Sequence, residues 1–391
     1  MKTIIPILIA LLLSLVTGEA YLRSQRPQLT YSRLPDADTG CYQADPIAFA
    51  VPKPGTTCII RTPEYTMKTP INPQGFLGTE SVNLQKTDGR TRIAFIGDSF
   101  TFGQGVSYDQ AYPALIGQLL NKQRIPAEIL NASMVGSGPQ WYYLRLKEMV
   151  KTYTPDIVVV GLYVGNDFGD LRYFQTPTID ASGLPLALTT RHEYVDTDGI
   201  RRPTSIPMRY RIPVLRNSHL FQMITTRMYG DVFASETPSI NADPCLLHLR
   251  CPDSTRDIEE TVRLLTGMQR ISMDMKSRLL VVLIPWELQL PRRILALSRI
   301  NFYATDKSRH IVSDTLMPRL YEAGISTLDL LSAFESYTGS EPVLYPQDRH
   351  WNAVGHTIAA EAIAPVLQSL ITATASGQAT ETARSPVSSD R

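Results

Sequence analysis

A serine that could act as a nucleophile ends an apolar run within residues 93–105, IAFIGDSFTFGQG. A serine hydroxyl is a weak nucleophile at neutral pH, so Ser99 would need a base that takes its proton. His350, in QDRHWNAVGH, is a candidate base. Asp348, two residues earlier, is a candidate for the acid that fixes the imidazole tautomer and stabilises the imidazolium. These three residue types together predict attack on an acyl ester.

Attack on an ester creates an oxyanion, which needs hydrogen-bond donors that are already in place. The candidate donors are the backbone N–H groups of Ser99 and Gly136 and the side-chain amide of Asn166. Gly136 lies in NASMVGSG and Asn166 lies in VGND, each after an apolar run. A glycine lets the backbone approach substrate because it has no Cβ. We expect this site to need no cofactor and no metal.

Each candidate also has a purely structural explanation. Ser99 could cap a helix, Gly136 could form a turn, Asn166 could cap a loop, and His350 could pack against Trp351. Chemistry is favoured because all these segments would converge at the carboxyl ends of parallel strands, where open α/β sheets bind ligands. A second histidine, His356, would lie on another helix face from His350 and is predicted to be structural.

The elements that must position these residues are visible as alternating patterns. The predicted strands are residues 92–99, 127–134, 156–167, 279–286 and 324–331. The predicted helices lie near residues 109–122, 139–152, 254–276, 306–323 and 352–371. Strands rich in Val, Ile and Leu that alternate with helices are typical of a parallel sheet covered on both faces. We predict an α/β fold, a flavodoxin-like doubly wound sheet of about five parallel strands.

One long segment, residues 168–253, interrupts the alternation between the third and fourth strands and is predicted to be an insertion that walls the site. Residues 201–230 within it contain six arginines and no acid, namely Arg201, Arg202, Arg209, Arg211, Arg216 and Arg227. We favour a solvated surface over a site for an anionic polymer. The other predicted parts are an irregular N-terminal segment (21–90), the main domain (91–371) and a disordered tail (372–391).

The N-terminus resembles an export signal. Lys2 precedes an apolar run from Ile4 to Val16, which is shorter than the ~20 residues of a membrane-spanning helix. A small-x-small pattern follows, so residues 1–20 are predicted to be a signal peptide cut after Ala20. The alternative is an uncleaved membrane anchor. Cleavage would leave no stable membrane span and a secreted or periplasmic protein.

The four cysteines agree with export. An even number in an exported chain predicts two disulfides, and of the three possible pairings, among which the sequence alone does not choose, we expect the local pairs Cys41–Cys58 and Cys245–Cys251. The segment CLLHLRC also offers His248 beside the second pair, but a zinc site would lack a fourth ligand.

Charge and composition exclude some functions. The chain has 38 basic and 37 acidic residues, so nothing indicates a nucleic-acid partner. Its hydrophobic content of 43% is typical of a packed globular core.

The motifs together resemble the SGNH, or GDSL, esterases and acyl hydrolases across about residues 92–371. FIGDSFTFG, NASMVGSG, VGND and DRHWNAVGH resemble the family's four blocks. The resemblance implies Ser99 as nucleophile, Asp348 and His350 as its partners, and Ser99, Gly136 and Asn166 as the oxyanion hole. The Asp-x-His spacing is similar to that of polysaccharide O-acetyltransferase relatives. INPQGFLGTE, upstream, resembles the lead-in of exported bacterial members.

The sequence therefore predicts a serine esterase that hydrolyses acetyl or short-chain esters of a small molecule or carbohydrate through an acyl-enzyme. One alternative is a polysaccharide O-acetyltransferase that uses the same three residues. Another is a non-catalytic flavodoxin-like binding module in which residues 97–105 hold a phosphate. The sequence does not favour such a module, because residues 97–105 do not form a Walker pattern: no lysine follows Gly103.

Overall fold

The computed structural model describes residues 4–28, 30, 38–86, 89–206, 208–229, 253–295, 306–346 and 348–375. Its centre is a sheet of five strands, β6 (Thr91–Gly97), β7 (Ala127–Asn131), β8 (Ile157–Tyr163), β13 (Arg278–Ile284) and β14 (Ser326–Asp329). The strands pair in parallel in the order β14-β13-β8-β6-β7. Counted along the chain, this is the flavodoxin-like order 2-1-3-4-5. The predicted fold class is confirmed.

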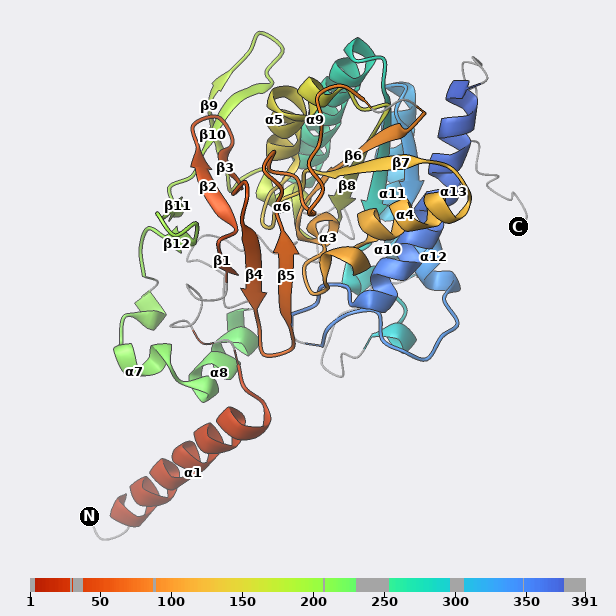
Figure 1. Cartoon of the computed structure of the whole chain (residues 1–391). Coiled ribbons are helices and arrows are strands. Elements are labelled where there is room, and N and C mark those ends of the chain that lie inside the picture. The colour runs from red at the N-terminus through yellow and green to blue at the C-terminus, as the bar shows by residue number, and fades with distance from the viewer. Residues whose placement is uncertain are drawn as a thin grey trace.

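Helices cover both faces of this sheet, as Figure 1 shows. The main ones are α4 (Tyr112–Lys122), α5 (Pro139–Glu148), α9 (Ser254–Asp274), α11 (Ile311–Glu322) and α13 (Ala353–Ala375). α4 packs against α13, whereas α5 and α11 both pack against α9. The central strand β8, IVVVGLY, is buried along its whole length because helices lie on both sides of it. α13 extends beyond the predicted domain end at residue 371.

The N-terminal segment 21–90 is not irregular as predicted. It contains β1 (Asp38–Thr39), β2 (Tyr42–Asp45), β3 (Phe49–Pro52), β4 (Thr57–Arg61) and β5 (Thr66–Pro70). β1, β4 and β5 form an antiparallel sheet, and β2 pairs with β3. These strands are too short and too interrupted by proline and glycine to give a clear alternating pattern.

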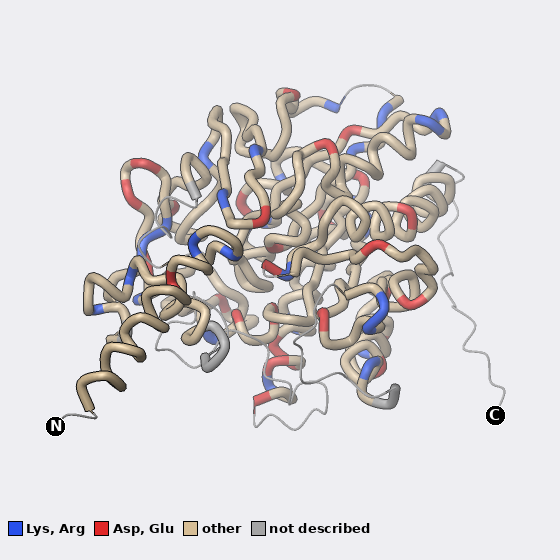
Figure 2. The backbone as a smooth tube through the Cα atoms, turned by 90° about the horizontal axis from the view of Figure 1, so that it is seen from below, with Lys and Arg blue, Asp and Glu red and all other residues tan. Residues whose placement is uncertain are grey.

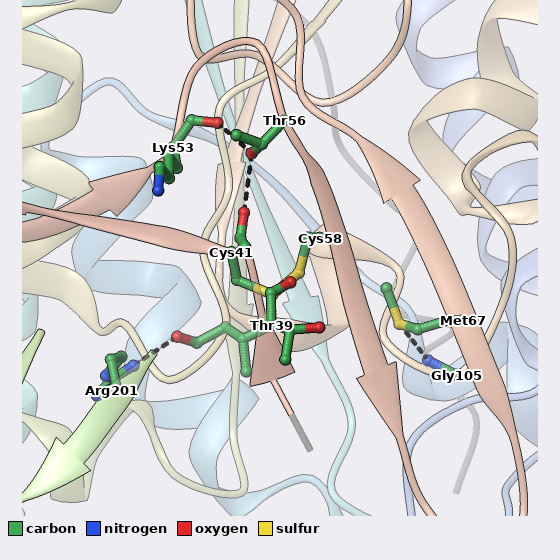
Figure 3. The surroundings of a disulfide bond; sticks show 10 residues. Thr39, Cys41, Lys53, Thr56, Cys58, Met67, Gly105 and Arg201 are labelled. Carbon is green, nitrogen blue, oxygen red and sulfur yellow. Dashed lines mark hydrogen bonds between the residues drawn. A yellow bond between two sulfur atoms is a disulfide. The ribbon is translucent and has the colours of Figure 1, made fainter. Parts of the chain in front are cut away.

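The predicted disulfide between Cys41 and Cys58 is present and links the start of this unit to β4. Figure 3 shows it between the strands, with Met67 of β5 beside Gly105. The backbone N–H of Gly105 lies 3.3 Å from the Met67 sulfur, so the N-terminal unit contacts the main domain there. Cys245 and Cys251 lie outside the described residues.

The described part of the predicted insertion contains two hairpins after residue 170, followed by two α-helices. β9 (Gln175–Ile179) pairs with β10 (Pro185–Thr189), and β11 (Glu193–Val195) pairs with β12 (Arg201–Pro203). The helices α7 (Pro213–Arg216) and α8 (His219–Tyr229) follow. Residues 230–252 are not described.

The remaining elements are shorter, apart from α1 (Ile4–Gln25), which projects from the body (Figure 1). They are α3 (Ser99–Phe102), α6 (Asp167–Asp170), α10 (Asp306–Arg309), α12 (Leu331–Ser336), η2 (Tyr108–Gln110), η3 (Val150–Tyr153), η4 (Met208–Tyr210), η6 (Glu287–Gln289) and η7 (Arg292–Ile294).

Candidate active site

Ser99 lies at the turn from β6 into the short helix α3. Asp98 is the N-cap of that helix, and its side chain accepts the Phe100 N–H at 2.9 Å. Ser99 therefore does not serve as the cap, and its hydroxyl points to another partner. Gly97 is required at the strand end, because a Cβ there would lie 2.1 Å from the Thr101 hydroxyl. The sequence Gly-Asp-Ser thus places a serine at the carboxyl end of the sheet while the aspartate satisfies the helix.

His350 is the partner of that serine. Its Nε2 lies 2.7 Å from Ser99 Oγ, and its Nδ1 hydrogen-bonds to Asp348 Oδ1. The imidazole also packs against the Phe100 ring, with centroids 5.0 Å apart. The structure thus brings the three predicted residues into one hydrogen-bonded line. A histidine held on both nitrogens has its tautomer and ring orientation fixed.

The one-residue spacing between the acid and the histidine depends on Arg349. This residue has a φ of 68°, in the left-handed region that few non-glycine residues adopt. Its guanidinium lies 3.3 Å from Glu287, which also accepts the Tyr163 hydroxyl at 3.0 Å. The turn lets Asp348 and His350 face each other although one residue separates them.

Asp348 is held by a hairpin that sequence reasoning missed. The Tyr65 hydroxyl donates to Asp348 Oδ2 at 2.9 Å, and Gln104 Nε2 donates to that hydroxyl at 3.0 Å. Glu64 accepts the Asp348 backbone N–H at 2.6 Å. Burial would raise the pKa of Asp348, but the charge and hydrogen bond of His350, together with the Tyr65 hydroxyl, lower this pKa below its ordinary value. The acid therefore stays ionised beside the histidine.

Gly136 lies in the loop after β7, next to the end of β6. The Met134 N–H donates to the Gly97 carbonyl at 3.1 Å, and the Ser137 hydroxyl donates to the same carbonyl at 3.2 Å. Gly136 itself has a φ of 64°, which glycine adopts without steric cost. This places the loop of Gly136 beside the strand that carries the nucleophile.

A buried arginine from the insertion holds the same loop. Arg201 Nη1 donates to the Val135 carbonyl at 2.8 Å and to the Gly136 carbonyl at 3.3 Å. Its charge is paired with Glu193 and lies 5.6 Å from the centre of the Tyr42 ring. The prediction of a solvated arginine surface is therefore wrong for Arg201, whose side chain is only 12% exposed. No sequence signal separated it from the other arginines.

Asn166 begins α6, just beyond the end of β8. Its side chain makes no capping hydrogen bond, and among the described residues its buried Oδ1 has no partner. The structural explanation of Asn166 as a cap is therefore not supported. β6, β7 and β8 are neighbours in the sheet, so Ser99, Gly136 and Asn166 follow three adjacent strand ends.

Buried carboxyl groups lie beneath these strand ends. Burial raises the pKa of Asp98 to about 6 and raises the pKa values of Asp167 and Asp170 well above the ordinary range. Asp167 accepts the Tyr142 hydroxyl at 2.8 Å and the Tyr163 N–H at 2.8 Å. Asp167 and Asp170 therefore tend to keep their protons, whereas a group with a pKa of about 6, such as Asp98, ionises near neutral pH.

His356 lies away from this line. It is fully buried, accepts the Tyr112 N–H at 3.3 Å, and packs against the Trp351 ring. Burial lowers its pKa to about 3. This is the structural placement predicted for it. Among the residues that the structure describes, no cluster of three or more His, Cys, Asp or Glu side chains could hold a metal ion. Cys245, His248 and Cys251, the residues considered for a zinc site, lie outside the described residues.

A family model matches the C-terminal part of the chain. Residues 249–390 match the model described as "SGNH hydrolase-like domain, acetyltransferase AlgX". The match contains Asp348 and His350, whereas Ser99, Gly136 and Asn166 precede it. No curated protein matches the chain.

Solved structures with a related arrangement include TesA, at 13% identity and a TM-score of 0.40, covering 72% of this chain and 99% of TesA. The acetyl xylan esterase AlAXEase has 13% identity and a TM-score of 0.38, covering 71% of this chain and 99% of its own. A variant of Axe2, an acetyl-xylooligosaccharide esterase from Geobacillus stearothermophilus, has 15% identity and a TM-score of 0.37, covering 72% and 94%. TM-scores below 0.5 do not allow the activities of these proteins to be assigned to this chain.

Proposed function

We propose that this chain is a serine esterase of the SGNH/GDSL family that cleaves acetyl or other short acyl esters through an acyl-enzyme on Ser99. The observation that carries the proposal is the hydrogen-bonded line from Ser99 through His350 to Asp348. Its substrate is a small-molecule or carbohydrate ester. The apolar N-terminal helix and the Cys41–Cys58 disulfide support action outside the cytoplasm.

In the first half-reaction, His350 Nε2 takes the proton of Ser99 Oγ while the oxygen attacks the ester carbonyl carbon. Asp348 stabilises the imidazolium that forms, without taking its proton. When the tetrahedral intermediate collapses, the bond to the leaving oxygen breaks and His350 returns its proton to that oxygen. In the second half-reaction His350 activates water, which attacks the acyl group and releases Ser99.

The oxyanion of both intermediates is assigned to the N–H groups of Ser99 and Gly136 and the amide of Asn166. Arg201 supports this assignment, because it fixes the loop of Gly136 before substrate arrives. Donors that are fixed in advance need no reorganisation at the moment of reaction, which is what makes them effective.

A second candidate, transfer of the acyl group to a sugar hydroxyl, is favoured by one observation. The matching family model carries an acetyltransferase in its description. Both reactions share the acyl-enzyme, and they differ only in the acceptor that His350 activates. The insertion that supplies Arg201 borders the site, and a walled site can favour a bound hydroxyl over water.

The test of the acyl-enzyme uses Ser99→Ala with a matched control. An organophosphonate probe should label the unaltered enzyme and not Ser99→Ala, and turnover of a p-nitrophenyl acetate substrate should fall at least ~10³-fold. Ser137→Ala, which removes a buried hydroxyl from the neighbouring loop, should still be labelled. Near-full esterase activity in folded Ser99→Ala would end the proposal.

The acceptor is tested by supplying an acetyl donor with and without excess oligosaccharide. We expect free acetate to dominate in both cases. If acetylated oligosaccharide dominates instead, the enzyme is a transferase, and the role of Ser99 still stands because both outcomes pass through it.

A further inference from the structure

The first part of α1 is an apolar rod that nothing in the described structure covers. Ile4–Gln25 has a mean hydropathy of 2.0 in its most apolar 18-residue window, and no part of that window is buried. Ile7 and Leu12, for example, are 65% and 62% exposed. Figures 1 and 2 show this helix projecting from the body, and Figure 2 shows its outer part without charged residues.

The base of α1 is built into the folded domain through Glu19. This carboxylate accepts the first backbone N–H groups of α8, from His219 at 3.0 Å and from Leu220 at 2.8 Å. It also accepts the Ser218 hydroxyl at 2.8 Å and pairs with Arg23 at 2.7 Å. The first N–H groups of a helix have no partner inside the helix, and Glu19 accepts two of them.

Cleavage after Ala20 would remove this carboxylate. The Gln28 N–H would still donate to His219 Nδ1 at 2.8 Å, but this contact is to the side chain of His219 and not to its backbone N–H. A leader that is discarded does not need a residue that completes a helix of the mature protein. Glu19 therefore favours a chain that keeps its first 20 residues.

The uncharged part of α1 is short for a bilayer. The 15 residues from Ile4 to Gly18 carry no charge and rise about 22 Å at 1.5 Å per residue, so a hydrocarbon core of ~30 Å would have to thin locally around them. Glu19 follows Val16 by three residues, so about 4–5 Å of helix rise separates it from the apolar run, within the headgroup layer. The start of α8 must lie at the same depth, because Glu19 contacts it.

The segment next to this contact has the surface that a headgroup layer would bind. Met208, Ile212 and Val214 are 67%, 56% and 73% exposed and lie close together in the sequence. Arg211 and Arg216 lie within the same segment. Exposed apolar side chains next to arginines are typical of elements that lie in a membrane interface.

We propose that α1 is a retained transmembrane anchor and that residues 208–216, with η4 and α7, rest on the adjacent bilayer surface. The anchor then fixes the insertion, and with it the Arg201 side of the active site, close to the membrane. This inference departs from the predicted cleavage after Ala20 and is independent of the proposed esterase activity.

Retention is tested on the full chain expressed with its own N-terminus in an exporting bacterial host. The intact mass should include the first 20 residues, and the protein should stay with the membranes after an alkaline carbonate wash. A mass that starts at Tyr21, or release by carbonate, would overturn the anchor.

The surface contact is tested with an environment-sensitive dye on Val214→Cys, in full chain reconstituted into phospholipid vesicles with nitroxide-labelled headgroups. Ile179→Cys is the control, because Ile179 is 56% exposed on β9, at the other end of the insertion from α1 (Figure 1). Several-fold stronger quenching at 214 than at 179 is expected. Equal quenching at the two positions would overturn the membrane contact. A dye signal at Val214→Cys that reports burial and depends on protein concentration, without quenching, would show that a second copy of the chain covers this face instead.

Discussion

The hydroxyl of Tyr65 supports the catalytic acid from a distant part of the chain, and its removal gives a sharp test of the site. Tyr65→Phe deletes the donor 2.9 Å from Asp348 Oδ2 and keeps the ring. The ring packs against Tyr345, with centroids 4.9 Å apart, so the hairpin should stay in place.

The expected size of the effect follows from the charge on Asp348. A hydrogen bond to an ionised group contributes ~1.5–3 kcal/mol. Asp348 is ionised before and during the reaction, so only the part that orients His350 differs between ground state and transition state. We take this part as about half of the upper value, or ~1.4 kcal/mol. A loss of this size in transition-state stabilisation corresponds to about a tenfold lower kcat.

The variant should also shift the pH profile. Without the Tyr65 hydroxyl the Asp348 carboxylate becomes more basic and stabilises the His350 imidazolium more strongly. The acid limb of kcat/KM, which reports the free enzyme, should therefore move to higher pH. The assay is steady-state hydrolysis of a p-nitrophenyl ester in a series of buffers, for the unaltered enzyme and the variant.

Tyr345→Phe is the matched control, because it removes a neighbouring hydroxyl that donates to the Gly105 carbonyl at 2.8 Å rather than to Asp348. It should keep the wild-type acid limb. A folded Tyr65→Phe with unchanged kcat and an unchanged acid limb would refute the role of this hydroxyl. An equal shift in both variants would show that the effect is not specific to Asp348.

Three further predictions concern the donors and a buried histidine. Asn166→Ala should lower kcat ~10²-fold with little change in KM, because its amide would contact charge that develops in the transition state; weaker binding at unchanged kcat would contradict this. Gly136→Ala should lower kcat and the free energy of unfolding, because a left-handed non-glycine residue costs ~1–2 kcal/mol and its Cβ would lie 2.7 Å from Arg201 Nη1; wild-type kinetics would contradict the close approach. The pKa of His356 falls from 6.5 to about 3 on burial, so its contribution to stability is complete above pH 6.5 and is lost as the pH falls toward 3. Urea titrations at pH 7.5 and pH 5 give the free energy of unfolding at each pH. Its decrease between pH 7.5 and pH 5 should be about 2 kcal/mol smaller in His356→Gln than in the unaltered enzyme. An equal decrease in both proteins would contradict this.

The sheet and the catalytic line could be predicted because their signals are local. β8 and β13 are continuous apolar runs, and parallel strands deliver their carboxyl ends to one edge. Ser99, His350 and Asp348 each directly follow or adjoin a recognisable pattern, so the sequence alone indicates where they meet.

The supporting residues could not be predicted because their signals are not local. Tyr65 and Glu64 lie in a short polar turn, and their partner Asp348 is 283 and 284 residues away. Arg201 lies in the same arginine-rich segment, residues 201–230, as the other arginines, and only the tertiary fold buries it against Glu193 and the loop of Gly136. Long-range pairing of short elements leaves no periodicity in a single sequence.

The distance along the chain between nucleophile and base also sets when the enzyme can first act. Ser99 and His350 are 251 residues apart, with four of the five sheet strands still to be made or paired when Ser99 emerges. Until the last strand and the turn after it have been synthesised and folded, the serine has no base and remains inert. A chain that leaves the cytoplasm N-terminus first would therefore carry a dormant hydroxyl through synthesis and translocation. Acyl chemistry would begin only with the completed protein, and activity would report full-length folding rather than mere presence of the polypeptide.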